Sequence, residues 1–189
     1  MDTHAPATDA PSRILDAAEN LIIARGVAAL TLEAAAREAG VSKGGLLYHF
    51  ASKEALLEAL LGRLSAFIDQ EFAACVAAQS EGKGRVARAM LEWGFGQGDL
   101  ACNERHERAG AVFLAAFHHD PALLAPIRAV IADMRAAVAA DGLPPGHGAA
   151  IMAAGDGLFM ARLFSLYAPS ATELTEMRAA LSGFLGIKP

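Results

Sequence analysis

A short stretch near the N-terminus combines a cation, two ring side chains and two glycines in a pattern that suits contact with DNA. The stretch contains Lys43, Gly44, Gly45, Tyr48 and His49. Lysine, tyrosine and histidine side chains can contact phosphates and base edges, and glycine lets the backbone approach a duplex closely. If these residues share the exposed side of one helix, they form a surface that reads DNA.

Two short helices joined by a tight turn are expected to carry this surface. Thr31 can cap a helix over residues 32–39 and Ser42 a second one over residues 43–50, because both side chains accept hydrogen bonds from free backbone N–H groups. Gly40 can take the left-handed conformation that ends the first helix. Two short helices with a glycine-containing turn match the helix-turn-helix pattern.

The second of these helices has a distinct inner side. Leu46 and Phe50 lie at helical spacing and are expected to point into the core, which leaves the five residues named above facing solvent. Ala35, Ala36 and Ala39 in the preceding helix are small enough to let the two helices cross closely. The spacing therefore predicts an exposed recognition helix.

The fold class predicted for the whole chain is all-α, with about nine helices and no credible strand. Hydrophobic residues, rich in alanine, make up 54% of the 189 residues and aromatic residues only 6%, which favours closely packed helices. Ser12 is expected to cap the first helix and Ser52 the fourth. Glycine and proline breaks give expected helices at 12–25, 32–39, 43–50, 53–78, 85–95, 104–118, 121–140, 148–167 and 171–185.

These breaks divide the chain into three regions. Residues 1–11 contain prolines and acids without an apolar run, and are interpreted as a flexible tail. Residues 12–58 are predicted to form a three-helix, helix-turn-helix DNA-binding domain. Residues 59–189 are predicted to form a second helical domain; a family resemblance, given below, implies that this domain senses a ligand and dimerises.

Composition excludes several other classes of protein. No stretch of about 18 strongly apolar residues is present, so no membrane span or membrane partner is expected. The N-terminus does not have the pattern of a secretory signal. Cys75 and Cys102 are too few for a disulfide framework and fit a reducing, cytoplasmic location as small buried residues. The net charge of −5 means that DNA binding must depend on the placement of a few cations.

The stretch from Thr31 to Leu57, TLEAAAREAGVSKGGLLYHFASKEALL, resembles the signature of TetR/AcrR-family transcriptional regulators. The resemblance runs without a gap from about Ser12 to Leu61, and Asp156-Gly157-Leu158 resembles part of a late helix of the family. It implies an all-α homodimer that binds double-stranded, palindromic operator DNA. It also implies that a small molecule binds the variable C-terminal domain and usually releases the operator.

The resemblance also assigns roles in DNA binding. Thr31 and Lys53 would hold phosphates from the starts of the second and fourth helices. Leu47 stands where many members carry a phosphate-contacting tyrosine, and the aromatic residue follows at Tyr48, so contact of Tyr48 with phosphate or with base stays open. The full set of predicted DNA-binding residues is Thr31, Ser42, Lys43, Gly44, Gly45, Tyr48, His49 and Lys53.

Aromatic and methionine side chains in the C-terminal two-thirds form a candidate ligand pocket. Such residues at helical spacing are also what an ordinary core contains, so both interpretations stay open. As a pocket they favour a small apolar or aromatic effector. The candidates are Met90, Trp93, Phe113, Phe117 and Met134.

Two adjacent helices, at 121–140 and 148–167, carry apolar residues at helical intervals and are candidates for a dimer interface. They could pack against their symmetry mates as a four-helix interface, or only within the chain. The candidate interface residues are Ile127, Ile131, Gly155, Phe159 and Arg162.

Patterns of catalysis and metal binding are weak, so no enzyme, catalytic residue, metal or cofactor is expected. His118 and His119 are adjacent on a helix and point about 100° apart, which disfavours a shared ion. Gly94, Gly96 and Gly98 do not follow a strand, as a phosphate-binding loop would require. The predicted function is a repressor released by a ligand; an activator with this fold, or a ligand-binding protein with a relic helix-turn-helix, are the alternatives.

Overall fold

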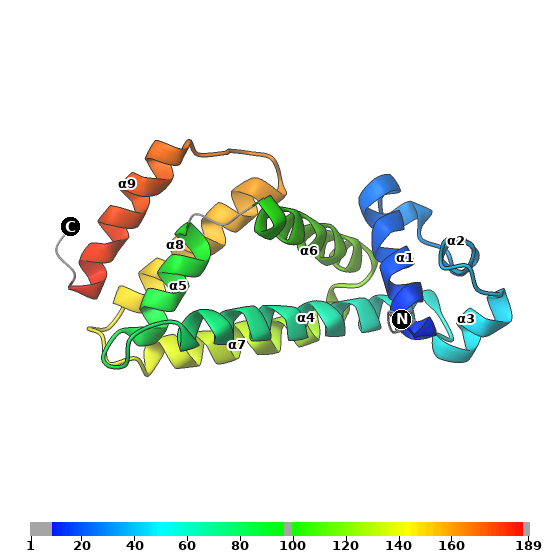
Figure 1. Cartoon of the computed structure of the whole chain (residues 1–189), viewed down its shortest axis with the longest axis horizontal. Helices are drawn as coiled ribbons and strands as arrows, with labels where there is room; N and C mark the ends of the chain where they lie inside the picture. Colours follow the sequence, from blue (N-terminus) through cyan, green and yellow to red (C-terminus); the bar gives the residue numbers. More distant parts are fainter. Residues whose placement is uncertain (1–8, 97–99, 187–189) are drawn as a thin grey trace, which may run out of the picture. The chain divides into compact units, whose positions relative to one another are not determined.

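The computed structural model describes residues 9–96 and 100–186, those from 100 to 107 by their backbone alone, and its regular elements are all helical (Figure 1). The prediction of an all-α fold with about nine helices is confirmed. The α-helices are α1 (Ala10–Arg25), α2 (Leu32–Glu38), α3 (Lys43–His49), α4 (Lys53–Ala77), α5 (Arg85–Phe95), α6 (Leu100–His119), α7 (Ala125–Ala139), α8 (His147–Leu163) and α9 (Ala171–Ser182). Short 3-10 helices lie at η1 (Val27–Ala29), η2 (Pro121–Leu124) and η3 (Gly183–Leu185).

The chain folds as two compact units. The first combines the residues up to Leu64 with Glu104–Pro126, and the second combines Ser65–Asn103 with the residues from Ile127 onward. The predicted helix-turn-helix range of 12–58 lies wholly inside the first unit. The sequence prediction places residues 104–126 in the ligand-sensing domain, whereas the structure groups them with the helix-turn-helix.

The start of α1 differs from the prediction. Asp9, not Ser12, is the N-cap: its carboxylate accepts a hydrogen bond from the Ser12 backbone N–H at 3.1 Å. Pro11 lies in the first turn, where its missing N–H removes no helical bond. Ala10 and Pro11 therefore belong to the helix and Asp9 caps it, whereas residues 1–8 of the predicted tail lie outside the described residues.

The core of the first unit fixes α1, α2 and α3 to one another. Ile14 and Ala18 on α1 and Leu30 before α2 have no exposed surface. Leu46 on α3 and Leu56 on α4 are equally buried, and α1 packs against both α2 and α3. Burial of each large aliphatic side chain stabilises the fold by about 1.5–3 kcal/mol, so the short helices are held mainly by packing.

The second unit is built around the crossing of α5 and α8. A Cβ atom on Gly94 would lie 3.5 Å from the Gly155 Cα, so the two backbones approach closely at these glycines. Gly84, at the start of α5, has no side chain with which to cap it. The Asp141 carboxylate provides the cap by accepting a hydrogen bond from the Ala87 N–H at 2.8 Å.

Two helices in the second half of the chain have bounds that differ from the predicted ones. The segment at 121–140 begins as the 3-10 helix η2, where Asp120 caps Ala122 at 2.8 Å. The helix at 148–167 stops at Leu163 because Ser165 has a φ of 52°. A hydrogen bond of 2.9 Å from the Leu166 N–H to the Ala161 carbonyl closes this turn, which is the usual geometry of a helix C-terminus.

Candidate DNA-binding site

The turn between α2 and α3 has the predicted geometry. Gly40 has a φ of 66°, which lies in the left-handed region that residues with a Cβ atom rarely adopt. The N–H of Gly40 donates to the Arg37 carbonyl at 3.2 Å, and that of Val41 donates to the Ala36 carbonyl at 3.0 Å. These bonds satisfy the last carbonyls of α2 and set the direction in which α3 leaves.

Side-chain caps fix the start of each helix around this turn. The Thr31 hydroxyl accepts a hydrogen bond from the Ala34 N–H at 3.1 Å, as predicted. The Ser42 hydroxyl accepts from the Gly45 N–H at 3.0 Å, and Ser52 caps α4 in the same way. Such caps contribute about 1 kcal/mol each, so the sequence encodes the three helix starts locally.

The short helix α3 separates an inner face from an outer face. Leu46 is fully buried and Phe50, directly after the helix, is 8% exposed. The predicted recognition residues Lys43, Gly44, Tyr48 and His49 are exposed, and Gly45 is half-buried. Tyr48 is 85% exposed and meets the His49 ring edge-on, with centroids 5.0 Å apart. The structure thus brings the cation and both rings together on one outward-facing helix.

Glycine has two different reasons to occur in this motif, and a pair of variants should separate them. Gly40→Ala should lower the free energy of unfolding by about 1 kcal/mol, because alanine is strained at a positive φ. Gly44 lies in the first turn of α3 with open space around it, so Gly44→Ala should stabilise the fold by about 0.5–1 kcal/mol.

Urea denaturation of the two variants would measure both effects. Gly44→Ala should nevertheless bind operator DNA more weakly, since its methyl group stands on the predicted contact surface. A Gly44→Ala protein that is both more stable and fully active in DNA binding would contradict close backbone approach at this position.

One side chain of the recognition helix is already bound within the chain. The Lys43 ammonium pairs with the Glu33 carboxylate of α2, with 2.5 Å between Nζ and Oε1. This hydrogen bond is the main reason why the pKa of Glu33 lies below its usual value. The sequence patterns did not predict this contact.

Lys53, predicted to hold phosphate from the start of α4, is half-buried. Its ammonium donates to the Val27 carbonyl of η1 at 3.2 Å. An ammonium has three N–H groups, so this bond leaves others for an external acceptor. Its contact with phosphate, like that of Thr31, stays a prediction.

The neighbouring Glu54 connects α4 to α6. Its carboxylate lies 2.8 Å from Nε2 of His119. Hydrogen bonding by its own backbone N–H at the helix start, followed by His119 and Ser52, lowers the pKa of Glu54 to about 2. The end of α6 is thereby tied to the first turn of the helix that follows the motif.

A second polar cluster joins α1, α4 and α6 within the first unit. Glu19 accepts from Arg63 of α4 and, at 2.8 Å, from Nε of Arg108 of α6. Arg63 also pairs with Asp16, and Arg108 donates to the Asn20 side-chain oxygen at 2.9 Å. None of these contacts was predicted, because they join residues far apart in the sequence. They explain why the structure groups this part of α6 with the helix-turn-helix.

The predicted ligand-pocket residues are divided between the two units. Met90 and Met134 are buried in the core of the second unit, where the half-buried Trp93 packs on Phe72 with ring centroids 5.8 Å apart. Phe113 is half-buried and Phe117 is 52% exposed, and both belong to the first unit. The structure does not bring all five together within one unit, and their role as ligand contacts stays a prediction.

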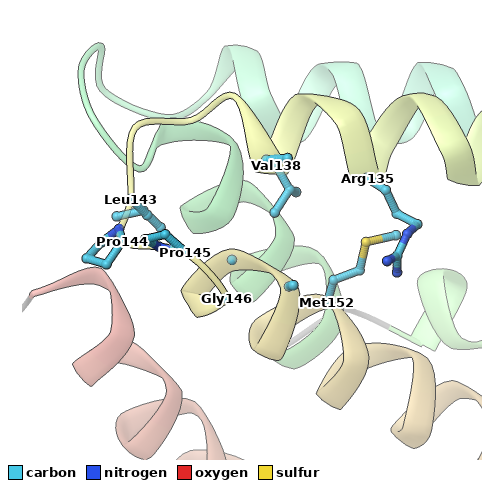
Figure 2. A pocket seen from close by; sticks show the side chains of 10 residues that line it. Arg135, Val138, Leu143, Pro144, Pro145, Gly146 and Met152 are labelled. Carbon is cyan, nitrogen blue, oxygen red and sulfur yellow. The ribbon is translucent and has the colours of Figure 1, made fainter.

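A pocket of about 350 Å³ lies elsewhere, between the end of α7 and the start of α8 (Figure 2). None of the five predicted residues lines it. Its wall combines apolar side chains with one guanidinium group. The lining residues are Arg135, Val138, Ala139, Leu143, Pro144, Pro145, Gly146, Gly148, Ala149 and Met152.

The predicted dimer residues differ in how much surface they offer. Ile127 is 7% exposed, and Gly155 faces α5 at the helix crossing, so contacts within the chain already occupy both. Ile131 and Phe159 are half-buried, and Arg162 is exposed. Their role in dimerisation stays a prediction.

In residues 9–96 and the described part of 100–186, no three His, Cys, Asp or Glu side chains gather as a metal site would require. None of the helices described is long and apolar enough to span a membrane.

Capped helices, a left-handed glycine turn and an outward-facing α3 together define a helix-turn-helix DNA-binding protein. A model of bacterial regulatory proteins of the tetR family matches residues 14–60. A second, described as a tetracyclin repressor-like C-terminal domain, matches residues 84–186, more than half of the chain. The chain therefore belongs to the TetR family of transcriptional regulators. Members of this family are in general DNA-binding proteins without enzymatic activity, and homodimerisation and ligand binding are typical of them.

Two curated relatives match about a third of this chain, and both come from Pseudomonas putida. The HTH-type transcriptional regulator SrpR is 42% identical over 59 residues, which are 31% of this chain and 28% of SrpR. The uncharacterized HTH-type transcriptional regulator TtgW is also 42% identical over 59 residues, 31% of this chain and 44% of TtgW. The match thus spans less than half the length of either relative.

Solved structures match along nearly the whole chain. The multidrug binding protein EbrR, complexed with malachite green, is 28% identical with a TM-score of 0.62, over 94% of this chain and 98% of EbrR. A transcriptional regulator from Rhodococcus sp. Rha1 has a TM-score of 0.68 at 22% identity, over 94% of this chain and 95% of its own, and shows the shared fold alone.

Proposed function

We propose that this protein is a dimeric, cytoplasmic repressor that binds a palindromic operator through α3 and leaves it when a small apolar or aromatic molecule binds. The observation that carries the proposal is the outer face of α3, where Lys43, Tyr48 and His49 are exposed while Leu46 anchors the helix. The intact Lys43, Tyr48 and His49 on a capped and anchored helix argue against a relic motif.

Selection of duplexes from a randomised pool is the direct test of sequence-specific binding. The protein should enrich a palindrome whose half-sites are about one helical turn apart, roughly 34–36 Å, because a two-fold dimer places two recognition helices at that spacing. A reporter gene placed behind the enriched sequence should be repressed. If no sequence is enriched, the proposal of sequence-specific binding is wrong. If reporter expression increases, the protein is an activator and not a repressor.

Dimerisation is proposed to use the end of α8 and the segment after it. Large apolar side chains are exposed there. Burial of such side chains in an interface would stabilise the dimer, because it removes apolar surface from water. We define this exit patch as Met160, Phe164, Leu166 and Tyr167. The predicted interface residues Phe159 and Arg162 lie on the same turns of α8, next to this patch.

Ligand binding is proposed for the second unit, which contains Trp93, the only tryptophan of the chain. The complex of EbrR with malachite green makes this dye a suitable first probe. We expect the dye to change Trp93 fluorescence and to weaken binding of the selected duplex about tenfold, which requires a preference of about 1.4 kcal/mol for the non-binding state.

Linkage gives this prediction a control that does not depend on where the dye binds. The selected duplex should weaken dye binding by the same factor as the dye weakens duplex binding. Titration of duplex with dye alone corrects for direct dye–DNA contact. Dye affinity that is unchanged by a saturating operator would exclude release by this ligand.

A further inference from the structure

The reading face of α3 carries a cation that is held by an acid. Lys43 and Glu33 lie ten residues apart in sequence, in the first turns of α3 and α2, and their side chains are 59% and 61% exposed. The hydrogen bond from Lys43 lowers the pKa of Glu33, so the carboxylate is ionised at neutral pH. The pair therefore stands at the surface proposed to face DNA, with its two charges neutralising each other.

This arrangement affects operator and non-operator DNA differently. Binding without sequence preference comes mainly from cations that replace counterions along the phosphates. While Lys43 stays on Glu33 it adds little to that attraction, and the carboxylate itself is repelled by the phosphates. An operator can offer Lys43 a base-edge acceptor instead, such as guanine O6 and N7. A hydrogen bond to this acceptor compensates for the lost contact between Lys43 and Glu33.

We propose that Glu33 is a specificity-determining residue: it retains Lys43 on non-operator DNA and gives it up only where the sequence supplies a matching acceptor. The proposal rests on the proposed function, since it requires α3 to face DNA. An exposed ion pair is weak, so a well-placed acceptor can replace it. With a net charge of −5, the chain depends on a few such cations, and the state of one of them matters.

The test compares DNA binding by five proteins: wild type, Glu33→Gln, Lys43→Gln, the double variant and Glu38→Gln. Glu38 is an exposed acid on the same helix and serves as the matched control for lost negative charge. Fluorescence anisotropy would follow binding to the selected operator and to a mixed-sequence duplex of equal length, over roughly 50–200 mM salt.

Glu33→Gln should bind the mixed-sequence duplex about three- to tenfold more tightly, with a salt dependence steeper by about one phosphate contact. Its operator affinity should change by less than that, so that the ratio of specific to non-specific binding falls. Glu38→Gln should bind like the wild type. In the Lys43→Gln background, Glu33→Gln should lose its effect, because Glu33 acts through Lys43.

Four results would overturn the inference. Glu33→Gln could bind mixed-sequence DNA like the wild type, it could match Glu38→Gln, or its effect could persist without Lys43. It could also lose operator affinity with relaxed preference at a cytosine, which would make Glu33 itself a base reader. Failure of the wild type to bind either duplex would instead remove the proposed function, and is distinguishable from all four.

Discussion

Lys43→Ala and Tyr48→Ala should each weaken binding of the selected operator by about 1–3 kcal/mol, or roughly 5- to 150-fold, if both side chains reach base edges. Both residues are exposed on α3, and the side chain of Tyr48, which is 85% exposed, is accessible to DNA. Neither supports the core, so the free energy of unfolding should hardly change. Anisotropy titrations with operator duplexes would give the affinities.

The same titrations would decide whether Tyr48 contacts phosphate or base. A lost phosphate contact weakens binding to all sequences alike and reduces the salt slope by about one, whereas a lost base contact relaxes preference at one position. Lys83→Ala is the matched control, since Lys83 is an exposed cation of the second unit. Wild-type affinity in both the Lys43 and Tyr48 variants would show that α3 does not read the operator.

What the sequence predicts well here is encoded within a few residues. Thr31 and Ser42 each cap a helix through an N–H group three residues onward, and Gly40 supplies a conformation that its neighbours avoid. Such features depend on local backbone geometry alone. The inner positions Leu46 and Phe50 follow from helical spacing, and both are buried as predicted.

What the sequence does not predict depends on how separate helices meet. Glu19 accepts hydrogen bonds from Arg63 and Arg108, which lie 44 and 89 residues further along the chain. No periodicity connects these positions, and any exposed acid of α1 would be an equal candidate. The contact between Lys43 and Glu33 similarly depends on the crossing of α2 and α3, which residue types do not specify.

The search for a ligand pocket illustrates a second limit of prediction from the sequence. Aromatic and sulfur-containing residues mark where apolar volume is available, yet the same residues fill cores. Met90 and Met134 are buried, whereas the pocket between α7 and α8 is lined largely by small residues and prolines with Arg135. A concave surface arises where side chains are short, and such residues carry no distinctive chemical signal in a sequence.

Phe164→Glu should convert the protein into a monomer that binds operator at least about 100-fold more weakly, because a monomer holds one half-site only and loses the avidity of about 10²–10⁴ that linked binding provides. The exit patch presents Phe164 with 52% of its surface exposed at the end of α8. A carboxylate there would have to be desolvated in the proposed interface. Sedimentation at micromolar concentration would measure the association.

Phe117→Glu is a closely matched control for this experiment. Phe117 is also 52% exposed, but it lies in the first unit, on α6, outside the exit patch. The two variants introduce the same charge at equally exposed aromatic positions, so general effects on solubility or folding should be alike. The Phe117 variant should remain a dimer while the Phe164 variant dissociates. Dimers of equal stability in both would place the interface on another face, and monomers in both would mean that the added charge acts through folding and not through the patch.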